Sequence, residues 1–358
     1  MERSVQQSEA IRVSVVVPCR NEIRHIRAFL DSVLRQELGG IEMEVLIADG
    51  MSDDGTRKVL REYAIGFPSL RVIDNPGKIV STGLNRAIRE TNGQIIIRMD
   101  AHTLYAPDYV RSCVEVLHES NADNVGGPAL ARGEGYLAEA IAHAYRTWFA
   151  SGGSSFHDPH REGSVETVPY GCWRKSTLDR LGLFDEDLVR SEDYDLNCRL
   201  IYSGGEVWQS PKIVSWYTPR TSLSKLFRQY FQYGFWKIGI LRKYRRIVSW
   251  RSLAPGSCLL GGAVLASCAA AASLSGSIWW RDLFLTSLLS LAAGYFVASL
   301  INAFSVARRE GWRFLPILPV VFAAYQLPYA LGSLLAILYR PVLRDLPPPI
   351  RKVVMDRR

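Results

Sequence analysis

The first 130 residues alternate between short, wholly apolar runs and longer segments that are apolar on one face only. The short runs are rich in Val, Ile and Leu, as in buried strands of a parallel sheet, and lie at 13–17, 43–48, 70–73, 94–99 and 124–127. Segments with helical spacing of their apolar residues lie at 22–35, 79–90 and 107–119, and another follows residue 55. Strands that alternate with helices predict an α/β fold with a doubly wound, mostly parallel sheet.

Polar clusters follow three of the predicted strands, directly where each strand ends. They are Pro18-Cys-Arg-Asn-Glu22, Asp49-Gly-Met-Ser-Asp-Asp-Gly55 and Asp100-Ala-His102. The carboxyl ends of parallel strands lie along one edge of a sheet, where ligands of open α/β folds bind. We therefore expect the three clusters to converge on one pocket. Ser52 or Asp53 is the expected N-cap of the helix that follows the second cluster.

Asp100 and His102 are two residues apart at the end of the most buried predicted strand. A carboxylate and an imidazole on one side of an extended segment could hold one divalent cation, Mn²⁺ or Mg²⁺. The alternative is that Asp100 caps the following turn and that His102 is only solvated.

The remaining polar residues of this edge suit a nucleotide. Asp49 could accept a hydrogen bond from a base or a ribose, and Arg20 and Lys78 could bind a diphosphate. The alternatives are an Arg20–Glu22 ion pair and a solvated Lys78. The first strand is not followed by G-x-G-x-x-G, and no G-x-x-x-x-G-K-[ST] occurs, which argues against a Rossmann dehydrogenase and a P-loop NTPase.

The middle of the chain carries a second acidic group. A helix is expected at 137–149, followed by a Gly-, Ser- and His-rich loop at 151–167 that is long enough for a functional lid. Ser191 is the expected N-cap of a further helix, which places Glu192 and Asp193 in its first turn. The alternative is that these acids only complement the helix dipole.

The second part of the chain has the composition of a membrane protein. Apolar segments at 253–274, 283–306 and 314–339 are each long enough to cross a bilayer. The predicted domains are a catalytic domain at 1–220, basic and aromatic interfacial helices at 221–252, a membrane region at 253–340 and a basic tail at 341–358. The net charge of +8 is concentrated after Lys225, which indicates an anionic bilayer as partner and no nucleic acid.

The charges leave the number of crossings open. Arg308, Arg309 and Arg313 favour the cytoplasmic side, with the catalytic domain on the cytosolic face of the inner membrane. The basic tail also favours the cytoplasm, whereas three crossings would place it outside. Pro316, Pro319 and Pro328 suggest a broken or re-entrant last segment, so two or three crossings are expected. The six scattered cysteines are expected to be reduced thiols.

Several motifs together resemble family 2 glycosyltransferases of the GT-A fold, and residues 11–240 carry this resemblance. The family motifs are Val15-Val-Val-Pro18-Cys-Arg-Asn21-Glu22, Asp49-Gly-Met-Ser-Asp53-Asp-Gly55, Asn75-Pro-Gly-Lys78, Asp100-Ala-His102 and Glu192-Asp193-Tyr-Asp-Leu-Asn-Cys-Arg199. Within the family, the chain is similar to membrane-associated glucosyltransferases of the succinoglycan type. That narrower likeness is carried by Tyr170-Gly-Cys-Trp-Arg174, Tyr217-Thr-Pro-Arg220 and the Arg228–Lys237 segment.

The resemblance implies an inverting transfer from a nucleotide diphosphate donor, expected to be a UDP-sugar, to a polyprenyl-linked saccharide. It implies a donor pocket made of Pro18, Arg20, Asn21, Glu22, Asp49, Asp53 and Asp100. The charge argument adds Lys78 to this pocket. Asp193 matches the catalytic base, and Glu192 is expected to orient it. Asp100 and His102 match the metal motif, with His102 where many members have Asp, which favours Mn²⁺.

A sugar and acceptor subsite is expected at Gly171, Trp173, Arg220, Gln229 and Trp236. Gly171 would permit close approach of the backbone and Trp173 would stack on a sugar, although ordinary core packing accounts equally for Trp173. Two other functions remain open. One is a processive polysaccharide synthase, and the other is a non-catalytic, membrane-anchored scaffold that binds nucleotide sugars.

Overall fold

The computed structural model describes residues 10–152, 155–244, 253–339 and 354. The chain divides into unit 1 (Met1–Leu130, Asp158–Tyr217 and Arg357–Arg358) and unit 2 (Ala131–His157 and Thr218–Asp356). The main division therefore falls close to the expected boundary at residue 220. Residues 131–157, expected within the catalytic domain, instead group with unit 2.

Unit 1 is built on an eight-stranded sheet with the strand order β3-β2-β1-β4-β9-β6-β10-β8. Its strands are β1 (Arg12–Cys19), β2 (Glu42–Asp49), β3 (Leu70–Asp74), β4 (Ile95–Arg98), β6 (Asn124–Gly126), β8 (Gly163–Ser164), β9 (Cys172–Arg174) and β10 (Val207–Gln209). The four strands from β3 to β4 in this order are mutually parallel, whereas β9 is antiparallel to both of its neighbours. The predicted α/β class with a mostly parallel sheet is confirmed.

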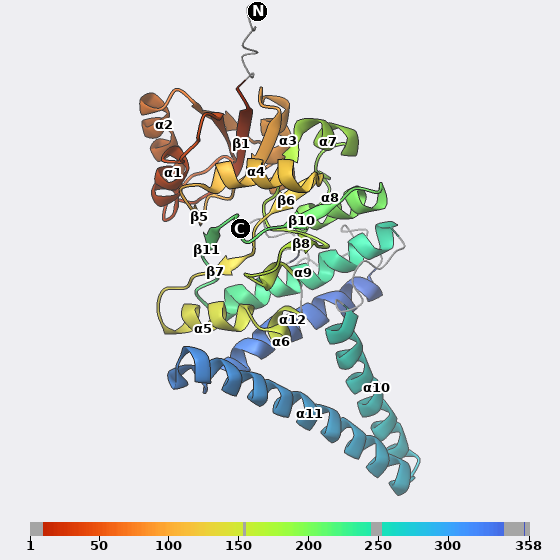
Figure 1. The fold of residues 1–358 in the computed structure, drawn as a ribbon. Helices are drawn as coiled ribbons and strands as arrows, with labels where there is room; N and C mark the ends of the chain where they lie inside the picture. The colour runs from red at the N-terminus through yellow and green to blue at the C-terminus, as the bar shows by residue number, and fades with distance from the viewer. Residues whose placement is uncertain (1–9, 153–154, 245–252, 340–353, 355–358) are drawn as a thin grey trace, which may run out of the picture. The chain divides into compact units, whose positions relative to one another are not determined.

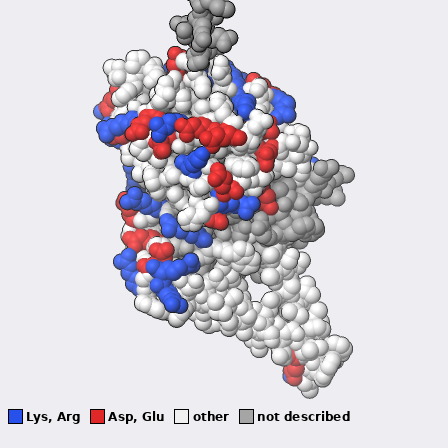
Figure 2. Space-filling model, in the orientation of Figure 1, with Lys and Arg blue, Asp and Glu red and all other residues white. Residues whose placement is uncertain are grey.

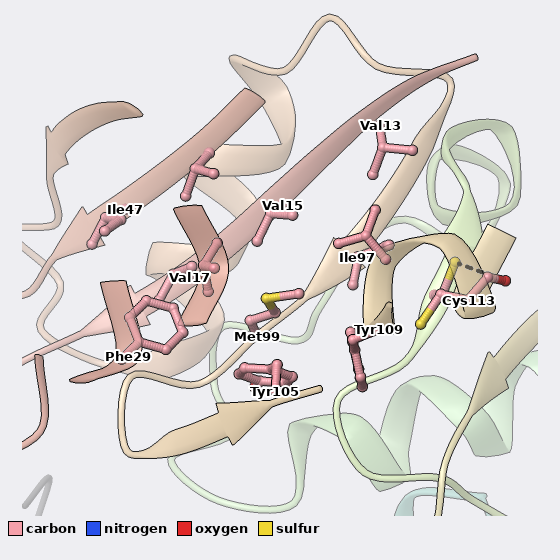
Figure 3. Close-up of a cluster of buried hydrophobic side chains, with 14 of the residues drawn as sticks. Val13, Val15, Val17, Phe29, Ile47, Ile97, Met99, Tyr105, Tyr109 and Cys113 are labelled. Carbon is pink, nitrogen blue, oxygen red and sulfur yellow. Dashed lines mark hydrogen bonds between the residues drawn. The ribbon is translucent and has the colours of Figure 1, made fainter. Parts of the chain in front are cut away.

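Alternate residues of the inner strands point to opposite sides of this sheet, and on both sides they are apolar. Helices therefore cover both faces. Val13, Val15 and Val17 of β1 pack with Phe29 and Tyr109 on one face (Figure 3). The other face of the sheet packs against Leu84, Leu178 and Leu196. The helices of unit 1 are α1 (Ile26–Leu34), α2 (Thr56–Gly66), α3 (Val80–Arg89), α4 (Tyr109–Ser120), α7 (Lys175–Leu181) and α8 (Glu192–Tyr202). Apart from the sheet, β5 (Thr103–Tyr105) pairs antiparallel with β11 (Ser215–Tyr217).

Two predicted helix caps are wrong. The residue before α2 is Gly55, with φ of 99°, and the side chain that accepts from the first helical amide (Thr56) is that of Asp54. Ser191 does precede α8, but its φ is 62° and its side chain makes no cap bond. A capping Ser needs an extended backbone, so the left-handed conformation of Ser191 rules out the predicted role.

The segment between the two parts of unit 1 is also more divided than predicted. The helix expected at 137–149 is α5 (Tyr136–Tyr145) followed by the short α6 (Trp148–Ser151). The Thr147 side chain accepts a hydrogen bond from the Ala150 amide and so begins the second helix. The expected loop at 151–167 contains the 3₁₀ turn η1 (Ser155–His157) and β8; β7 (Leu130–Ala131) precedes α5.

The remaining elements of unit 2 are α9 (Leu223–Tyr244), α10 (Ala254–Leu274), α11 (Ile278–Glu310), the 3₁₀ turn η3 (Trp312–Phe314) and α12 (Leu318–Leu338). Among the described residues, α10, α11 and α12 are long and apolar enough to cross a membrane. The last segment is not broken at Pro328, because α12 is one helix with this proline inside it, and the re-entrant alternative stays a prediction. The interfacial prediction beyond residue 244 and the basic tail, apart from Val354, lie outside the described residues.

Glycines bring α9 and α12 into close contact, and Figure 1 shows the two helices side by side. A Cβ atom on Gly234 of α9 would lie 2.0 Å from the Tyr329 carbonyl oxygen, and one on Gly332 of α12 would lie 2.1 Å from that of Phe231. Both helices therefore need a residue without a side chain at the crossing.

Candidate active site

The polar ends of the parallel strands lie at one level of the sheet. Cys19 of β1 pairs in register with Asp49 of β2, and Asp49 with Asp74 of β3. On the other side of β1, Val16 pairs with Arg98, so Asp100 lies just beyond the end of β4. The clusters after β1, β2 and β4 therefore lie at one edge of the sheet, as expected, and their convergence on one pocket stays a prediction.

Hydrogen bonds from backbone amides to side-chain oxygens join the loops that follow β1 and β2. The Asn21 amide donates to Ser52 Oγ over 2.9 Å, and the Asp53 amide donates to Asn21 Oδ1 over 3.0 Å. The Glu22 amide donates to Thr56 Oγ1 over 2.9 Å. Asn21 has a φ of 56°, a left-handed conformation that Asn tolerates better than most residues. The two loops therefore form one polar wall, which holds four of the predicted donor residues, Arg20, Asn21, Glu22 and Asp53.

Asp49 lies at the expected edge but not in the expected state. Its side chain is 0% exposed, its oxygens accept from the Ser52 amide over 3.2 and 3.4 Å, and Arg57 Nη1 lies 3.7 Å away. The Arg57 side chain also pairs with Asp74. A direct contact from Asp49 to a nucleobase does not fit this conformation. The carboxylate is used instead to shape the loop after β2.

The two predicted phosphate-binding cations differ in their surroundings. The Arg20 side chain lies over Gly50, where a Cβ atom would come within 3.1 Å of it, and its Nε is buried without a hydrogen-bond partner in the described part of the chain. Glu22 lies near His102, with 3.5 Å between Oε1 and Nδ1, and forms no ion pair with Arg20. Lys78 is exposed in a left-handed turn, consistent with either reading of that residue.

A buried arginine joins the end of β4 to the start of α8. Arg98 donates from Nε and Nη2 to the two carboxylate oxygens of Asp100, over 3.0 and 3.2 Å. Its Nη1 lies 3.1 Å from Glu192 Oε1, with an orientation that favours charge attraction over a hydrogen bond. The Arg98 side chain is only 7% exposed. The guanidinium of Arg98 therefore contacts both Asp100, a predicted metal ligand, and Glu192 of the predicted Glu-Asp turn.

The charges of this group act on one another strongly because water is largely excluded. Burial alone would lower the pKa of the Arg98 guanidinium, but Asp100, Glu192 and Asp193 hold that pKa well above its ordinary value. Burial raises the pKa of the Glu192 carboxyl, which Arg98 opposes and Asp193 reinforces. Three carboxylates thus surround one guanidinium.

Asp100 and His102 supply donors that suit a divalent cation. Each Asp100 oxygen accepts one hydrogen bond from Arg98 and keeps lone pairs for a further ligand, and the His102 side chain is 38% exposed. Among the described residues, no group of three or more His, Cys, Asp or Glu side chains is placed to hold a metal. The fit therefore requires further ligands from a bound diphosphate or water.

The prediction that Trp173 stacks on a sugar is wrong for this conformation. The side chain is 1% exposed, packs edge-on against Phe184 and belongs to the core. Gly171 serves that packing, because at its φ of 98° a Cβ atom would lie 2.4 Å from the Trp173 ring. The alternative of ordinary core packing accounts for both residues.

The other predicted acceptor residues belong to unit 2. Trp236 is 6% exposed and its Nε1 donates to the Val354 carbonyl over 3.2 Å, so stacking on a sugar does not fit this conformation. Gln229 is half-buried, with its amide donating to the Tyr233 hydroxyl, and Arg220 is also half-buried. An acceptor role for Gln229 and Arg220 stays a prediction.

Sequence reasoning missed two arginines that organise the site, Arg57 and Arg98. Arg57 carried no signal, because a basic residue in the first turn of an amphipathic helix is ordinary. Arg98 did carry one, because it is a charged residue in the strand Ile95-Ile-Ile-Arg98 and lies two positions before Asp100. Residues two apart in a strand share a face, so a pair with Asp100 was foreseeable.

Comparison with known proteins bears on what such a site does. The profile of "Glycosyl transferase family 2" matches residues 14–174, and that of "Glycosyl transferase family group 2" matches residues 95–333. The succinoglycan biosynthesis protein ExoA of Rhizobium meliloti (strain 1021) is 34% identical over 247 residues, which are 67% of this chain and 73% of that protein. The chain belongs to glycosyl transferase family 2. Residues 14–174 include β1, β2 and β4, whose ends form the site.

Two further similarities concern a second relative and the fold. A dolichyl N-acetyl-α-D-glucosaminyl phosphate 3-β-D-2,3-diacetamido-2,3-dideoxy-β-D-glucuronosyltransferase of Methanococcus voltae is 29% identical over 246 residues, or 66% of this chain and 76% of that protein. Among solved structures, the mannosyltransferase PcManGT of Pyrobaculum calidifontis, in complex with GDP-Man and Mn²⁺, superposes with a TM-score of 0.59. It is 20% identical, and the match covers 91% of this chain and 88% of that one, which supports the GT-A-like fold.

Proposed function

We propose that this glycosyltransferase is an inverting enzyme that moves a sugar from a nucleotide diphosphate donor to a lipid-linked saccharide in the synthesis of an exopolysaccharide or another surface glycan. The single observation that carries the proposal is the Arg98 bridge between Asp100 and Glu192. It joins the strand edge at which α/β folds bind nucleotides to an acidic turn that suits proton transfer.

The wall formed by the loops after β1 and β2 is the proposed donor subsite. Asn21, Glu22 and Asp53 are fixed there by backbone hydrogen bonds, so little ordering is needed when a ligand binds. The buried Nε of Arg20 still has donor capacity, and the exposed Lys78 adds positive charge. We assign these two cations to the diphosphate and Pro18 to the wall of the same subsite.

Asp193 is the proposed general base, at the start of α8. It is half-buried, and its negative charge helps to raise the pKa of the Arg98 guanidinium. In the proposed reaction Asp193 accepts the proton of the acceptor hydroxyl, and that oxygen attacks the anomeric carbon from the face opposite the nucleotide. Glu192 is tied to Arg98 and holds the turn in place.

Asp100 and His102 are the residues that would hold a divalent cation, Mn²⁺ or Mg²⁺. A cation bound there would neutralise charge that develops on the departing diphosphate. Arg98 orients the Asp100 carboxylate through its two hydrogen bonds. The metal in the PcManGT complex supports this assignment for the present chain.

A lipid-linked acceptor is supported by the apolar helices of unit 2 and by the named activity of the Methanococcus relative, which acts on a dolichyl phosphate saccharide. We propose a polyprenyl diphosphate saccharide as acceptor, with the catalytic unit on the cytosolic face of the cytoplasmic membrane. The name of the Rhizobium relative supports the assignment to exopolysaccharide synthesis.

The proposal is tested with the full-length protein in lipid nanodiscs. A panel of nucleotide sugars, with and without Mn²⁺, is screened for a rise in the unfolding temperature, because a ligand that binds only the folded state stabilises it. The donor that is found is then supplied with polyprenyl diphosphate saccharides, and the anomeric configuration of the product is determined. The expected result is a single sugar added with inversion.

Other outcomes separate the two remaining functions. Release of a long polymer would identify a processive synthase. A protein that binds a donor but transfers nothing to any lipid-linked acceptor or to water would identify a scaffold, and transfer with retention would contradict the assignment of Asp193.

A further inference from the structure

The three apolar helices of unit 2 differ in how much of their surface is covered by protein. Within the most apolar window of each helix, 11% of the residues are buried in α10, 6% in α11 and 50% in α12. The sides of α10 and α11 are thus open to lipid, whereas half of α12 faces other parts of the protein. The three helices are alike in apolar composition and in being long enough to span, but they differ in how much protein surrounds them.

The first neighbour of α12 is α9, a helix that cannot lie in hydrocarbon. The two helices run in the same direction in close contact, from Tyr230 against Tyr325 to Arg242, which donates to the carbonyls of Ala336 and Ile337. The basic residues of α9 are Lys225, Arg228, Lys237, Arg242 and Lys243, all but Lys237 exposed. Charged side chains at the centre of a bilayer are strongly disfavoured. A helix that follows α9 over this length must therefore share its shallow depth.

The second neighbours of α12 are α5 and α6, which cover its first half. The Tyr325 hydroxyl donates to the Ile141 carbonyl, and the Gln326 amide donates to that of Phe149. The covering helix α5 carries Glu139, which forms an ion pair with Arg313 in the connection between α11 and α12. His143 of α5 lies 3.3 Å from Glu310, the last residue of α11. Charged side chains therefore lie just before the start of α12.

The hairpin formed by α10 and α11 gives the geometry that decides the path of α12. The two helices are antiparallel, with Gly262 of α10 beside Leu288 and Leu291 of α11. The start of α10 and the end of α11 therefore lie at the same face of any membrane the hairpin crosses. In Figure 1 these two ends lie at opposite ends of α12, while the turn of the hairpin points away from it.

Contacts of α12 with both of these ends support the same geometry. A Cβ atom on Gly256, near the start of α10, would lie 3.6 Å from Ser333 of α12. Ala303 and Val306, near the end of α11, share a core cluster with Phe322. A third crossing helix would instead run beside the hairpin toward its turn. Because α12 contacts the hairpin where it leaves one face, it lies along that face.

The length of α11 agrees with this arrangement. Its 33 residues extend about 50 Å at 1.5 Å per residue, well beyond a hydrocarbon core of about 30 Å. Residues 283–307 carry no charge, and burial by protein begins at Ser299. The first part of α11 therefore spans and the last part emerges to pack on α12. On the face seen in Figure 2, the arm built from α10 and α11 shows charged side chains near its tip and at the far end of α11, and the surface between them is uncharged.

We propose that α10 and α11 are the two crossings of this protein, and that α12 lies with α9 in the membrane interface, on the side from which the chain enters the hairpin. Lipid acyl chains surround the hairpin, and anionic headgroups contact the exposed basic residues of α9. The segment after residue 339 then starts on the side of the membrane on which α9 lies. The inference rests on membrane association alone and does not depend on the transfer reaction.

The first test maps sidedness in the full-length protein. In a background with Cys258→Ser and Cys268→Ser, single cysteines are introduced as Ser224→Cys before the hairpin, Ser275→Cys at its turn and Tyr339→Cys after α12. Sealed vesicles of known orientation are treated with a membrane-impermeant maleimide. We expect Ser224→Cys and Tyr339→Cys to react from one side and Ser275→Cys from the other. Reaction of Tyr339→Cys from the side of Ser275→Cys would mean a third crossing and would overturn the proposal.

The second test measures depth along the exposed side of α12. Val320, Leu327 and Leu338, which are 49%, 46% and 78% exposed, are replaced singly by cysteine and labelled with a fluorophore. Lipids brominated at known positions then report the depth of each label, with Leu291→Cys in α11 as the deep reference. We expect one shallow depth for all three sites.

Two results of the depth measurement would count against the proposal. A label at Leu327→Cys as deep as that at Leu291→Cys would show that α12 spans. Absence of quenching at all three sites, with normal quenching at Leu291→Cys, would show that another copy of the chain covers α12 in place of lipid. Neither result depends on catalytic activity, so the outcome is separate from that of the transferase assay.

Discussion

The two units of this protein hold their key contacts together by opposite means. In unit 1, Arg98 joins β4 to α8 because three carboxylates gather around one buried guanidinium. In unit 2, α9 and α12 meet because Gly234 and Gly332 place no side chain between the helices. The contact in unit 1 depends on the charges of its side chains. The contact in unit 2 depends on the absence of side chains at two glycines and involves no charge. Substitutions that alter only one of these properties should therefore act on only one unit.

The largest expected effect is on catalysis in unit 1. Asp193→Asn keeps the shape of the side chain and removes the proton acceptor, so we expect the rate of transfer to fall by about 10²–10⁴-fold. The dissociation constant of the donor, measured by calorimetry, should change little. Asp187→Asn, at an exposed acid before the same helix, is the matched control and should retain activity. A loss of donor affinity in Asp193→Asn would place this residue in the donor subsite instead.

The next effect tests the charge of Arg98. Arg98→Met removes the guanidinium and leaves Asp100 and Glu192 without their buried partner, which should lower the free energy of unfolding by about 3–5 kcal/mol. Arg98→Lys keeps the charge but loses the two parallel bonds to Asp100, so it should recover part of that stability. Chemical denaturation of both variants provides the measurement.

A double substitution separates the pairing from general damage at this position. Adding Glu192→Gln to Arg98→Met removes one of the unpaired charges, so its cost should be smaller than in the wild-type background. Equal costs in both backgrounds would show that Arg98 and Glu192 do not interact. Unit 2 should be unaffected, with unchanged labelling of cysteines in α12.

A smaller effect is expected from adding one methyl group in unit 2. Gly234→Ala and Gly332→Ala each place a Cβ atom about 2 Å from a carbonyl oxygen, so we expect a loss of about 1–3 kcal/mol as α9 and α12 move apart. Gly239→Ala, in the same helix with no atom within 4 Å, is the control and should stabilise the protein by up to about 1 kcal/mol. Thermal unfolding in detergent measures all three. Equal effects of Gly234→Ala and Gly239→Ala would contradict the close contact.

The same contrast explains what the sequence could predict. The strand ends of unit 1 were predictable, because apolar runs that stop at polar clusters mark the carboxyl edge of a parallel sheet. The antiparallel strand β9 was not, since three residues at Cys172–Arg174 carry no pattern of their own. The caps predicted at Ser52 or Asp53 and at Ser191 were wrong because the left-handed conformations of Gly55 and Ser191 are set by the surrounding loops and not by residue type alone.

The sequence could predict which residues belong to the candidate site, but not how they contact one another. Asp100, His102, Glu192 and Asp193 stood out by type and position, but the bridge through Arg98 depends on a fold that joins residues about 90 positions apart. Burial reversed the expectations for Trp173 and Trp236, because an aromatic residue in a motif can serve packing as well as a ligand. In unit 2, hydropathy found all three apolar helices but did not distinguish α12, whose difference lies in its neighbours.

The smallest effect concerns one hydrogen bond in the polar wall of unit 1. Ser52→Ala removes the oxygen that accepts from the Asn21 amide, at a cost of about 0.5–1.5 kcal/mol in the free energy of unfolding. Because Asn21 in turn accepts from the Asp53 amide, both loops should loosen and the donor should bind more weakly, while the rate at saturating donor stays close to that of the wild type. Ser176→Ala, at an exposed position in α7, is the matched control. A fall in that saturating rate with unchanged donor affinity would show that the loop after β2 is not part of the donor subsite. The polar contacts of unit 1 that matter for function would then be those around Arg98.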